Sequence, residues 1–515
     1  MSSLQSLTQT FPSTRPRVFI LTDISNEPDD AESLVRYLLY SNQFRTEGIV
    51  AVTSTWMKNK TCPQDIHKIL NAYEKAVGNL NNHVHPDFPY PSAGELRELV
   101  KTGPSCYGFE ALGGYEGKEW EMSSGAQLLL ERLEASIGEE GNDPLWVLVW
   151  GGTNVLAQVL MHAKSNCDEE EITRLLSRLR VYAISDQDDT ASWIRRSFPN
   201  IFYISSVHAW NQYGIAAWTG IGGDKYYGFD QGGPDFDKLT KEWIKENIQT
   251  GPLGEAYPDY IFIPEGDTPT FLYLVQNGLG VPEHPEYGSW GGRYELSDKG
   301  PTRHAGRHYG DAHDSVTGKD GNVHRSNQAT IWRWRDAFQN DFAARMRWSL
   351  TTDFKEANHH PVVCVNGTKG FEPLEIEAEA GSIVELDAEG TYDPDGNAEG
   401  LSFKWFHYRE PTATQWSTHL EVQEVEFTPI DEWKKGKKVQ MKLPGPEKCC
   451  VDLMSRKPVR KGQKMHLILE VTDRGTPPLK SYRRVIVQTT NRELKGGVGD
   501  GEDHGNIADA MAGMQ

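Results

Sequence analysis

The stretch Arg17-Val-Phe-Ile-Leu-Thr-Asp-Ile-Ser-Asn-Glu-Pro-Asp-Asp-Ala-Glu-Ser-Leu-Val-Arg36 joins an apolar run to a group of acidic residues and then to a helical pattern. In an open α/β sheet, ligands bind beyond the carboxyl ends of the strands, which is where this acidic group would lie. Carboxylates so close in sequence repel one another unless a cation, protons or hydrogen bonds offset their charge. The candidates for a catalytic or metal site are Asp23, Glu27, Asp29 and Asp30.

Helix capping is the alternative role for two of these residues. Apolar residues recur with a helical period after Asp30, so Asp29 and Asp30 fall in the first turn of the predicted helix. Acidic side chains are favoured there by the helix dipole. Capping does not account for Asp23 and Glu27.

Length and charge limit the classes of function. A chain of 515 residues suggests roughly two to four domains. The formal net charge of -20 argues against a nucleic-acid or anionic-membrane partner, because both need concentrated positive charge. No apolar run reaches the roughly 18 to 20 residues that span a bilayer, and the first residues lack a hydrophobic signal core. We therefore expect a soluble, cytoplasmic protein, or a secreted one if a signal peptide has been removed.

Residues 15–355 alternate short β-rich runs with helical stretches, which predicts an open, mainly parallel α/β sheet with helices on both faces. The predicted strands are 18–21, 48–52, 146–150, 181–184, 201–204 and 260–263. The predicted helices are 31–40, 63–77, 124–137, 153–164, 169–179, 190–197, 235–247 and 329–350. Residues 264–328 show little periodicity and are expected to form a long functional loop.

The character of the chain changes after residue 361. Alternating β segments with turn signals predict a β-sandwich over residues 361–490, and the Gly-rich polar tail 491–515 is expected to be disordered.

Four polar clusters follow predicted strands of the first domain: residues 23–30, 151–154, 185–189 and 264–267. Strand ends of the same polarity meet at one edge of a doubly wound sheet, so these clusters are expected to converge on one acidic pocket. Hard oxygen ligands favour Ca²⁺ or Mg²⁺, and the absence of a Cys/His pattern argues against zinc.

The motifs resemble those of nucleoside hydrolases, which carry a D-x-D-P-G-x-D-D signature after the first strand, a Gly-rich Thr-Asn segment and a late His-Asp. The matching stretches are Asp23-Ile-Ser-Asn-Glu-Pro-Asp-Asp30, Gly151-Gly-Thr-Asn-Val-Leu-Ala157 and His313-Asp314. Ser185-Asp-Gln-Asp-Asp-Thr-Ala-Ser-Trp-Ile-Arg195, Tyr287-Gly-Ser-Trp-Gly-Gly-Arg293 and Ile331-Trp-Arg-Trp-Arg335 resemble a group known as cellulose-binding proteins. In that group a nucleoside-hydrolase-like domain precedes an immunoglobulin-like domain.

The resemblance implies a Ca²⁺ site in which Asp30, the Thr153 carbonyl and Asp314 are ligands, with Asp311 as the competing choice for the last. It also implies that Asp29, Asp186 and Asp188 bind a sugar. Trp210 and Trp290 lie among polar loop residues, where a flat ring stacks well on a sugar face. The predicted substrate-binding set is Asn26, Asp29, Asn154, Asp186, Asp188, Trp210, Glu265, Trp290 and Arg293.

One position departs from the signature. The Asp that binds the metal and accepts the proton of the attacking water aligns with Ser25, and a serine hydroxyl is too weakly basic for that task without an activating partner. Asp23 and Glu27 are near enough in sequence to replace it as the base.

The resemblance therefore implies a Ca²⁺-dependent hydrolase of an N- or O-glycosidic bond, in which a metal-bound water attacks the anomeric carbon of a small-molecule or oligosaccharide glycoside. His208, His304, His308 and His313 are candidate proton donors to the leaving group. The alternative is a non-catalytic carbohydrate-binding protein on a degenerate hydrolase scaffold. Related scaffolds form homo-oligomers, so a homodimer is also an expectation, although no residue pattern demonstrates one.

Overall fold

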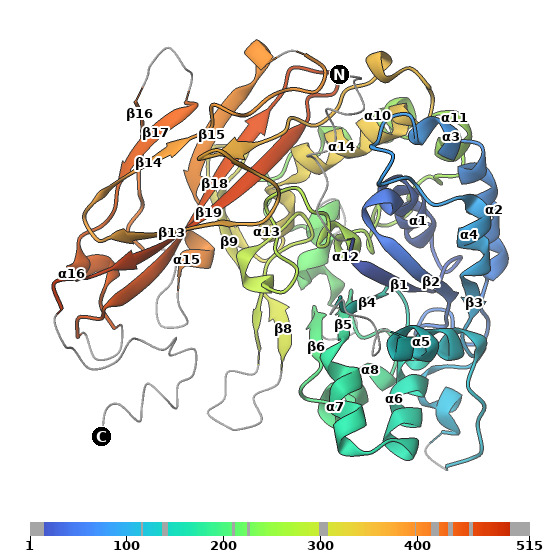
Figure 1. Ribbon diagram of the computed structural model, residues 1–515. Helices are drawn as coiled ribbons and strands as arrows, with labels where there is room; N and C mark the ends of the chain where they lie inside the picture. The colour runs from blue at the N-terminus through green and yellow to red at the C-terminus, as the bar shows by residue number, and fades with distance from the viewer. Residues whose placement is uncertain are drawn as a thin grey trace.

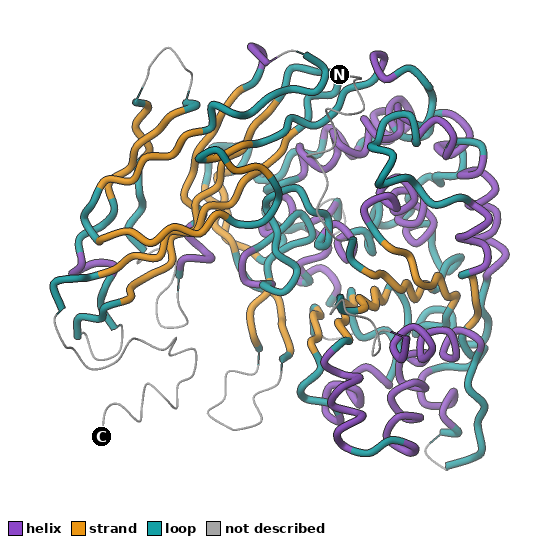
Figure 2. The backbone as a smooth tube through the Cα atoms, in the orientation of Figure 1, coloured by secondary structure: helices purple, strands orange, loops and turns teal. Residues whose placement is uncertain are grey.

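A computed structural model describes residues 15–114, 117–135, 143–208, 212–223, 227–297, 307–396, 398–413, 422–430, 436–452 and 457–494. Figure 1 shows an α/β domain at the right and a pair of β-sheets at the left, and Figure 2 shows the same backbone with helices flanking the central strands. In the described part of the chain, no helix combines the length and the apolar character needed to cross a membrane.

The α/β domain is built on an eight-stranded sheet in the order β3-β2-β1-β4-β5-β6-β8-β7. All neighbouring pairs are parallel except β7 and β8. The strands are β1 (Arg17–Thr22), β2 (Arg45–Ala51), β3 (Val100–Thr102), β4 (Leu145–Val149), β5 (Leu179–Ala183), β6 (Phe202–Ser205), β7 (Tyr294–Leu296) and β8 (His308–Asp311).

Side chains of β1 point alternately to the two faces of the sheet, and each face packs into its own hydrophobic cluster. Val18 and Ile20 face one hydrophobic cluster, and Phe19 and Leu21 face another on the opposite side of the sheet. The first side is covered mainly by α1 (Asp29–Tyr40), α2 (Pro63–Glu74), α4 (Ala93–Glu98), α12 (Pro269–Leu272) and α14 (Arg335–Trp348). The second is covered by α5 (Ser124–Ala135), α6 (Asn154–Asn166), α7 (Glu169–Ser177) and α8 (Thr190–Ser197). The remaining short helices of this domain are α3 (Val77–Leu80), α10 (Lys241–Asn247), α11 (Gly251–Gly254) and α13 (Ala329–Trp332).

The strand order reverses beside β1, because the chain runs outward from β1 to β3 on one side and from β4 to β6 on the other. Such a switch point leaves a crevice at the carboxyl ends of the two central strands. Asp23 follows β1 directly and the segment 151–154 follows β4, so both open into this crevice.

The C-terminal region forms two facing sheets around a separate core, as expected for a β-sandwich. One sheet has the order β13-β19-β18-β15, with bounds Leu374–Glu379, Lys480–Thr490, Lys461–Thr472 and Ser402–His407. The other has the order β14-β17-β16, with bounds Ile383–Asp387, Lys438–Lys442 and Phe427–Pro429. Two hairpin pairs complete the strands: β9 (Asp314–Thr317) with β10 (Val323–Ser326), and β11 (Cys364–Val365) with β12 (Thr368–Lys369). Short helices α15 (Arg409–Thr412) and α16 (Pro446–Cys449) flank the sheets. The immunoglobulin-like type of this sandwich stays a prediction.

Strand β19 belongs to both cores. Val485 and Val487 point into the sandwich, whereas Tyr482 packs into the core of the α/β domain. Its backbone also pairs with that domain: the Tyr482 amide donates to the Asn277 carbonyl at 2.9 Å and the Arg484 amide donates to the Gly278 carbonyl at 3.0 Å. The Arg484 guanidinium is fully buried and donates to the Leu279 carbonyl at 2.9 Å.

A buried ion group joins the same two regions. Asp314 at the start of β9 accepts hydrogen bonds from Arg293 at 2.7 Å, Arg333 at 2.6 Å and the Tyr408 hydroxyl at 2.7 Å. Burial alone would raise the pKa of Asp314, but the two guanidinium groups hold it below its ordinary value. Asp314 is therefore committed to the junction between the α/β domain and the sandwich.

The predicted fold class is confirmed, with three local corrections. Residues 260–263 form bends rather than a strand. Residues 264–328 contain α12 and strands β7, β8, β9 and β10 instead of one long loop, and the predicted helix 329–350 is broken between α13 and α14. The predicted disordered tail lies almost entirely outside the described residues, which end at 494.

We predict that Gly278→Ala destabilises the protein by roughly 2–4 kcal/mol, measured by urea unfolding. Gly278 has φ +88°, and an added Cβ would lie 2.0 Å from the Tyr482 carbonyl oxygen across the junction. Gly381→Ala is the matched control, because Gly381 has φ +78° but an added Cβ would find its nearest neighbour at 4.0 Å. Equal destabilisation by the two variants would show that the junction contributes nothing beyond backbone strain.

Candidate metal centre and sugar pocket

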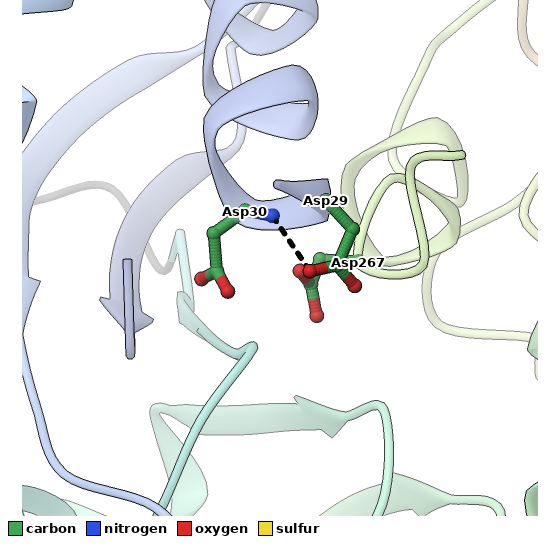
Figure 3. Close-up of side chains that lie close together, drawn as sticks. All are labelled: Asp29, Asp30 and Asp267. Carbon is green, nitrogen blue, oxygen red and sulfur yellow. Dashed lines mark hydrogen bonds between the residues drawn. The ribbon is translucent and has the colours of Figure 1, made fainter. Parts of the chain in front are cut away.

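Three carboxylates from distant parts of the chain meet at the crevice. Asp29 and Asp30 lie in the first turn of α1, and Asp267 reaches them from the turn before α12 (Figure 3). Oxygen atoms of these three side chains all lie within 4.8 Å of one another. The N-cap position of α1 is Pro28, which makes no side-chain cap bond, but Asp29 Oδ1 accepts from the Asp30 amide at 3.0 Å in the first turn, so one carboxylate also serves the helix.

The surrounding loops approach these carboxylates closely because glycines line them. A Cβ on Gly266 would lie 2.7 Å from Asp29 Oδ2, and a Cβ on Gly151 would lie 2.9 Å from Asp23 Oδ1. Thr22 donates a short hydrogen bond to Asp30 Oδ1, which orients that carboxylate at the end of β1. The site therefore depends on two positions where a side chain has no room.

An ion pair behind the site holds the loop that carries Asp267. Arg36 of α1 donates to Glu265 Oε2 at 2.9 Å and to the Phe338 carbonyl at 2.6 Å. The Glu265 amide donates to Glu32 at 2.8 Å, and Glu265 itself has φ +57°. Helix α1 thus fixes both its own two carboxylates and the loop that supplies the third.

Burial and mutual repulsion raise the pKa values of the acidic group. Burial raises the pKa of Asp23 to about 6, against hydrogen bonds that favour its ionised form. Burial and the charges of neighbouring carboxylates raise the pKa values of Asp29, Asp30 and Asp267 well above their ordinary range, and that of Glu27 is also raised. Within the described residues, none of these five carboxylates has a Lys or Arg ion-pair partner.

The donor set fits a hard divalent cation. Buried Asp23 Oδ2 and Asp267 Oδ2 have no hydrogen-bond partner in the protein, and such orphaned oxygens cost free energy unless something binds them. Carboxylate oxygens are the ligands that Ca²⁺ prefers. The cluster has no Cys or His member, so it lacks the nitrogen and sulfur ligands typical of zinc sites.

A cavity of about 380 Å³ opens above this cluster. Glu27, Asp29 and Asp267 line it together with five aromatic residues: Trp56, Tyr213, Trp218, Tyr227 and Phe262. Trp56 is 50% exposed and donates from Nε1 to the Tyr213 hydroxyl at 3.1 Å, so its ring stands at the mouth. Trp218 is 7% exposed and its Nε1 has no partner in the protein. Flat rings beside carboxylates and free donors are the surroundings in which a sugar binds.

Comparisons with known proteins identify the family of the chain. The model of the nucleoside hydrolase-like domain of cellulose-binding Sde182 matches residues 17–294, which is more than half of the chain. The chain belongs to this family. The model of the C-terminal domain of cellulose-binding protein Sde0182 matches residues 383–489.

Among solved structures, the chain is similar to a nucleoside hydrolase-related hypothetical protein from Saccharophagus degradans that is associated with carbohydrate metabolism. The two share 28% sequence identity with a TM-score of 0.70, over 93% of this chain and 100% of that one. The effector protein XOO4466 is more distant, at 11% identity and a TM-score of 0.32 over 68% of this chain and 98% of its own. No curated protein matches the sequence.

The Sde182-family scaffold brings only part of the predicted site together. Asn26, Glu27 and Asp29 line the cavity, and Asp23 and Asp30 lie in the buried cluster with them. The Asp188 carboxylate instead has a structural role: it accepts hydrogen bonds from the Thr153 hydroxyl, the Asn154 backbone amide and the Thr190 hydroxyl. The Asn154 side chain donates to Thr53 at 2.9 Å, and the Thr153 carbonyl accepts from the Ala157 amide at 2.9 Å at the start of α6. The role of that carbonyl as a metal ligand stays a prediction.

Other predicted residues are placed away from the cavity. Asp186 forms a two-point ion pair with Arg195, and Glu265 pairs with Arg36. Arg293, predicted to bind substrate, pairs instead with Asp314 and Glu295. Trp290 is only 1% exposed and packs edge-on against Tyr482, so the expectation of an exposed stacking ring there is wrong. Trp210 and His304 lie outside the described residues.

Asp267 is the residue that sequence reasoning missed. The segment Pro264-Glu-Gly-Asp267 was singled out, but Glu265 was chosen from it, and the structure gives Asp267 the place in the cluster. Asp314 and Asp311, the two choices for the last ligand, are placed outside the cluster: Asp311 accepts from Ser206, Ala217 and Asn327. Trp218 and Tyr227 carried no local signal beyond being aromatic.

Ser25, which the sequence analysis aligns with the second Asp of the nucleoside hydrolase signature, lies outside the buried group. It has φ +79° and is exposed, and its hydroxyl donates to Asp65 Oδ2 at 2.6 Å. Asp65 lies in the first turn of α2 and also binds Lys68. A serine with an acidic partner is thus present beside the cluster without joining it.

We predict that Asp267→Asn weakens Ca²⁺ binding at least about tenfold, whereas Asp314→Asn leaves it within about twofold of wild type. Asp314→Asn should instead lower the free energy of unfolding by roughly 3–5 kcal/mol, because it leaves two buried guanidinium groups without their carboxylate. Titration calorimetry on metal-stripped protein and urea unfolding measure the two effects. If Asp314→Asn weakens Ca²⁺ binding and Asp267→Asn does not, Asp314 is the metal ligand and the assignment of Asp267 is wrong.

We also predict that the difference in melting temperature between Ca²⁺-saturated and metal-free protein grows as the pH rises from about 5 to about 7.5. The folded cluster holds protons that the unfolded chain has already released, because its pKa values are raised, to about 6 for Asp23. Those protons offset the repulsion at low pH and are lost as the pH rises through that value, so the metal-free protein becomes less stable. Calorimetric melting with chelator or CaCl₂ measures the difference, and Asp30→Asn should flatten its pH dependence. A difference independent of pH would contradict the prediction.

Proposed function

We propose that the protein is a Ca²⁺-dependent hydrolase of a glycosidic bond. The observation that supports it is the joint lining of one cavity by ionisable carboxylates and aromatic rings, directly above a buried cluster suited to a cation. Membership of a family with a nucleoside hydrolase-like domain, and a relative associated with carbohydrate metabolism, also support a sugar as the ligand.

In this proposal Asp29, Asp30 and Asp267 hold the cation, with Asp23 beside them. When bound, Ca²⁺ supplies a Lewis-acid charge that lowers the pKa of water and orients it. Asp29 borders both the cluster and the cavity, so it is also placed to accept a hydrogen bond from a sugar hydroxyl.

Glu27 is the better placed of the two candidate bases. It lines the cavity and is partly exposed, whereas Asp23 is only 2% exposed and lies beneath. The raised pKa of Glu27, caused by burial and by the charge of Asp23, makes it a stronger base than an ordinary carboxylate. Glu27 takes one proton from the attacking water, whose oxygen bonds to the anomeric carbon while the bond to the leaving group breaks.

The leaving group requires a proton, and three of the predicted histidine donors lie next to the cavity. His208, His308 and His313 line a neighbouring cavity, and the ring of His208 contacts Tyr213 edge-on with centroids 4.9 Å apart. The developing positive charge on the sugar is stabilised by the acidic surroundings, as the oxocarbenium-like transition state requires.

The second candidate function is non-catalytic carbohydrate binding. Two observations support this function. Ser25 stands where the nucleoside hydrolase signature has its proton acceptor, and its hydroxyl binds Asp65 instead of the buried cluster. The matching family models are named for cellulose binding. In that case the aromatic cavity binds a sugar and no bond is cleaved.

We predict that Glu27→Gln lowers kcat about 10²- to 10⁴-fold with a small change in KM, because it removes the base and keeps the shape of the cavity. Product release from a panel of nucleosides and of furanosyl and pyranosyl glycosides, with CaCl₂ present, is the measurement. Asp65→Asn is the matched variant and should retain activity. Loss of activity in Asp65→Asn alone would assign the base to Ser25, and sugar binding without release from any member of the panel would favour the binding protein.

A further inference from the structure

A second, larger cavity adjoins the proposed sugar pocket. Its volume is about 860 Å³, against about 380 Å³ for the first, and Tyr227 lines both. The wall between them is aromatic: Tyr213 of the first cavity contacts His208 of the second. The first cavity lies at the small end of the roughly 300–1,000 Å³ range of single small-molecule sites, and the second near the large end, so the pair offers more space than one sugar ring needs.

Two buried hydroxyl groups mark the two cavities. Ser185 lies just after β5 and lines the first, and Ser205 ends the neighbouring strand β6 and lines the second. Each residue is 2% exposed, and neither Oγ has a hydrogen-bond partner in the protein. A buried hydroxyl without a partner is costly unless a ligand or water supplies one. Each cavity thus has one unpartnered serine hydroxyl, and the two lie at the ends of adjacent strands. This arrangement indicates a ligand that extends into both cavities.

Exposed apolar side chains gather at the same two openings. Trp56 and Phe262 line the first cavity and are 50% and 54% exposed, and Val207 and Ile215 line the second and are 66% and 57% exposed. Apolar faces beside hydrogen-bonding groups match a saccharide, in which C–H faces alternate with hydroxyl edges.

The guanidinium of Arg195 and the carboxylate of Asp311, which both line the second cavity, are already hydrogen-bonded by the protein. Arg195 is held by both oxygens of Asp186 at 2.6 Å, and Asp311 accepts three hydrogen bonds from Ser206, Ala217 and Asn327. A phosphate would find no unpaired guanidinium among the described residues of the lining. The second cavity is therefore suited to a neutral polar ligand.

We propose that the ligand is a neutral oligosaccharide of at least two sugar units, with one unit in the cavity above the carboxylates and the next in the cavity lined by Ser205. This inference rests on the proposed function and specifies its substrate class. The bond between the two units then lies near Tyr227, which lines both cavities, and the proposed base Glu27 lines the first of them.

Titration calorimetry on the Ca²⁺-loaded full-length chain tests the proposal with glucose, cellobiose and cellotriose, and in parallel with xylose, xylobiose and xylotriose. In the series that binds, affinity should rise at least about tenfold from one unit to two. Ser205→Ala should remove about five- to tenfold of the affinity for the two- and three-unit ligands and leave the single sugar unchanged. Ser185→Ala should weaken all members of the series by a similar factor.

Melting temperature separates these effects from misfolding. Neither serine hydroxyl has a partner to lose, so both variants should melt at or slightly above the wild-type temperature, and exposed Ser177→Ala should match wild type in stability and in binding. Equal affinity for one, two and three units, or an equal effect of Ser205→Ala on all three, would overturn the two-unit ligand while leaving glycoside hydrolysis in place. No binding in either series, together with no release from the glycoside panel, would overturn the proposed function as well.

Discussion

Repulsion among buried carboxylates is the constraint around which the α/β domain is arranged. The charges of Asp23 and Asp29 raise the pKa of Asp30, and all three raise that of Asp267, so a fold that collects these residues must hold them against that repulsion. The restraints are covalent and steric: three of the four lie between the end of β1 and the first turn of α1, and the fourth is carried by a loop anchored through Glu265 to Arg36. The surrounding fold therefore holds the carboxylates in place, which lowers the entropy cost of ordering the ligands of a cation.

The β-sandwich extends this restraint to the neighbouring cavity. Asp314 binds Tyr408 of the sandwich, and the preceding residues Asp311 and His313 line the second cavity. Arg484 similarly fixes the carbonyl groups of Leu279 and Tyr287. The four-stranded sheet thus uses one face to close its own core and the other to position segments of the α/β domain, which gives the C-terminal domain a structural part in shaping the site.

Local sequence patterns predicted the fold well because its signals are local. The apolar run of β1, the acidic residues after it and the helical period of α1 all lie within 24 residues, Arg17 to Tyr40. The errors came from contacts that no local pattern contains. The sequence pattern favours Glu265 over Asp267 as a site residue, but Arg36, distant in sequence, forms an ion pair with Glu265. Trp290 has the polar neighbours of an exposed ring, yet it is buried against Tyr482 of the sandwich.

The negative charge of the pocket would help catalysis and simple sugar binding to different extents. A neutral sugar interacts with an acidic cluster through a few hydrogen bonds, which one or two carboxylates supply as well as five. An oxocarbenium-like transition state carries positive charge, so it interacts with the whole cluster, and that difference between ground and transition states is what accelerates a reaction. When all five carboxylates are ionised, a divalent cation neutralises only part of their charge, and the remainder still acts on the sugar. Five carboxylates gathered at the cost of mutual repulsion are therefore better explained by hydrolysis than by retention of a neutral ligand.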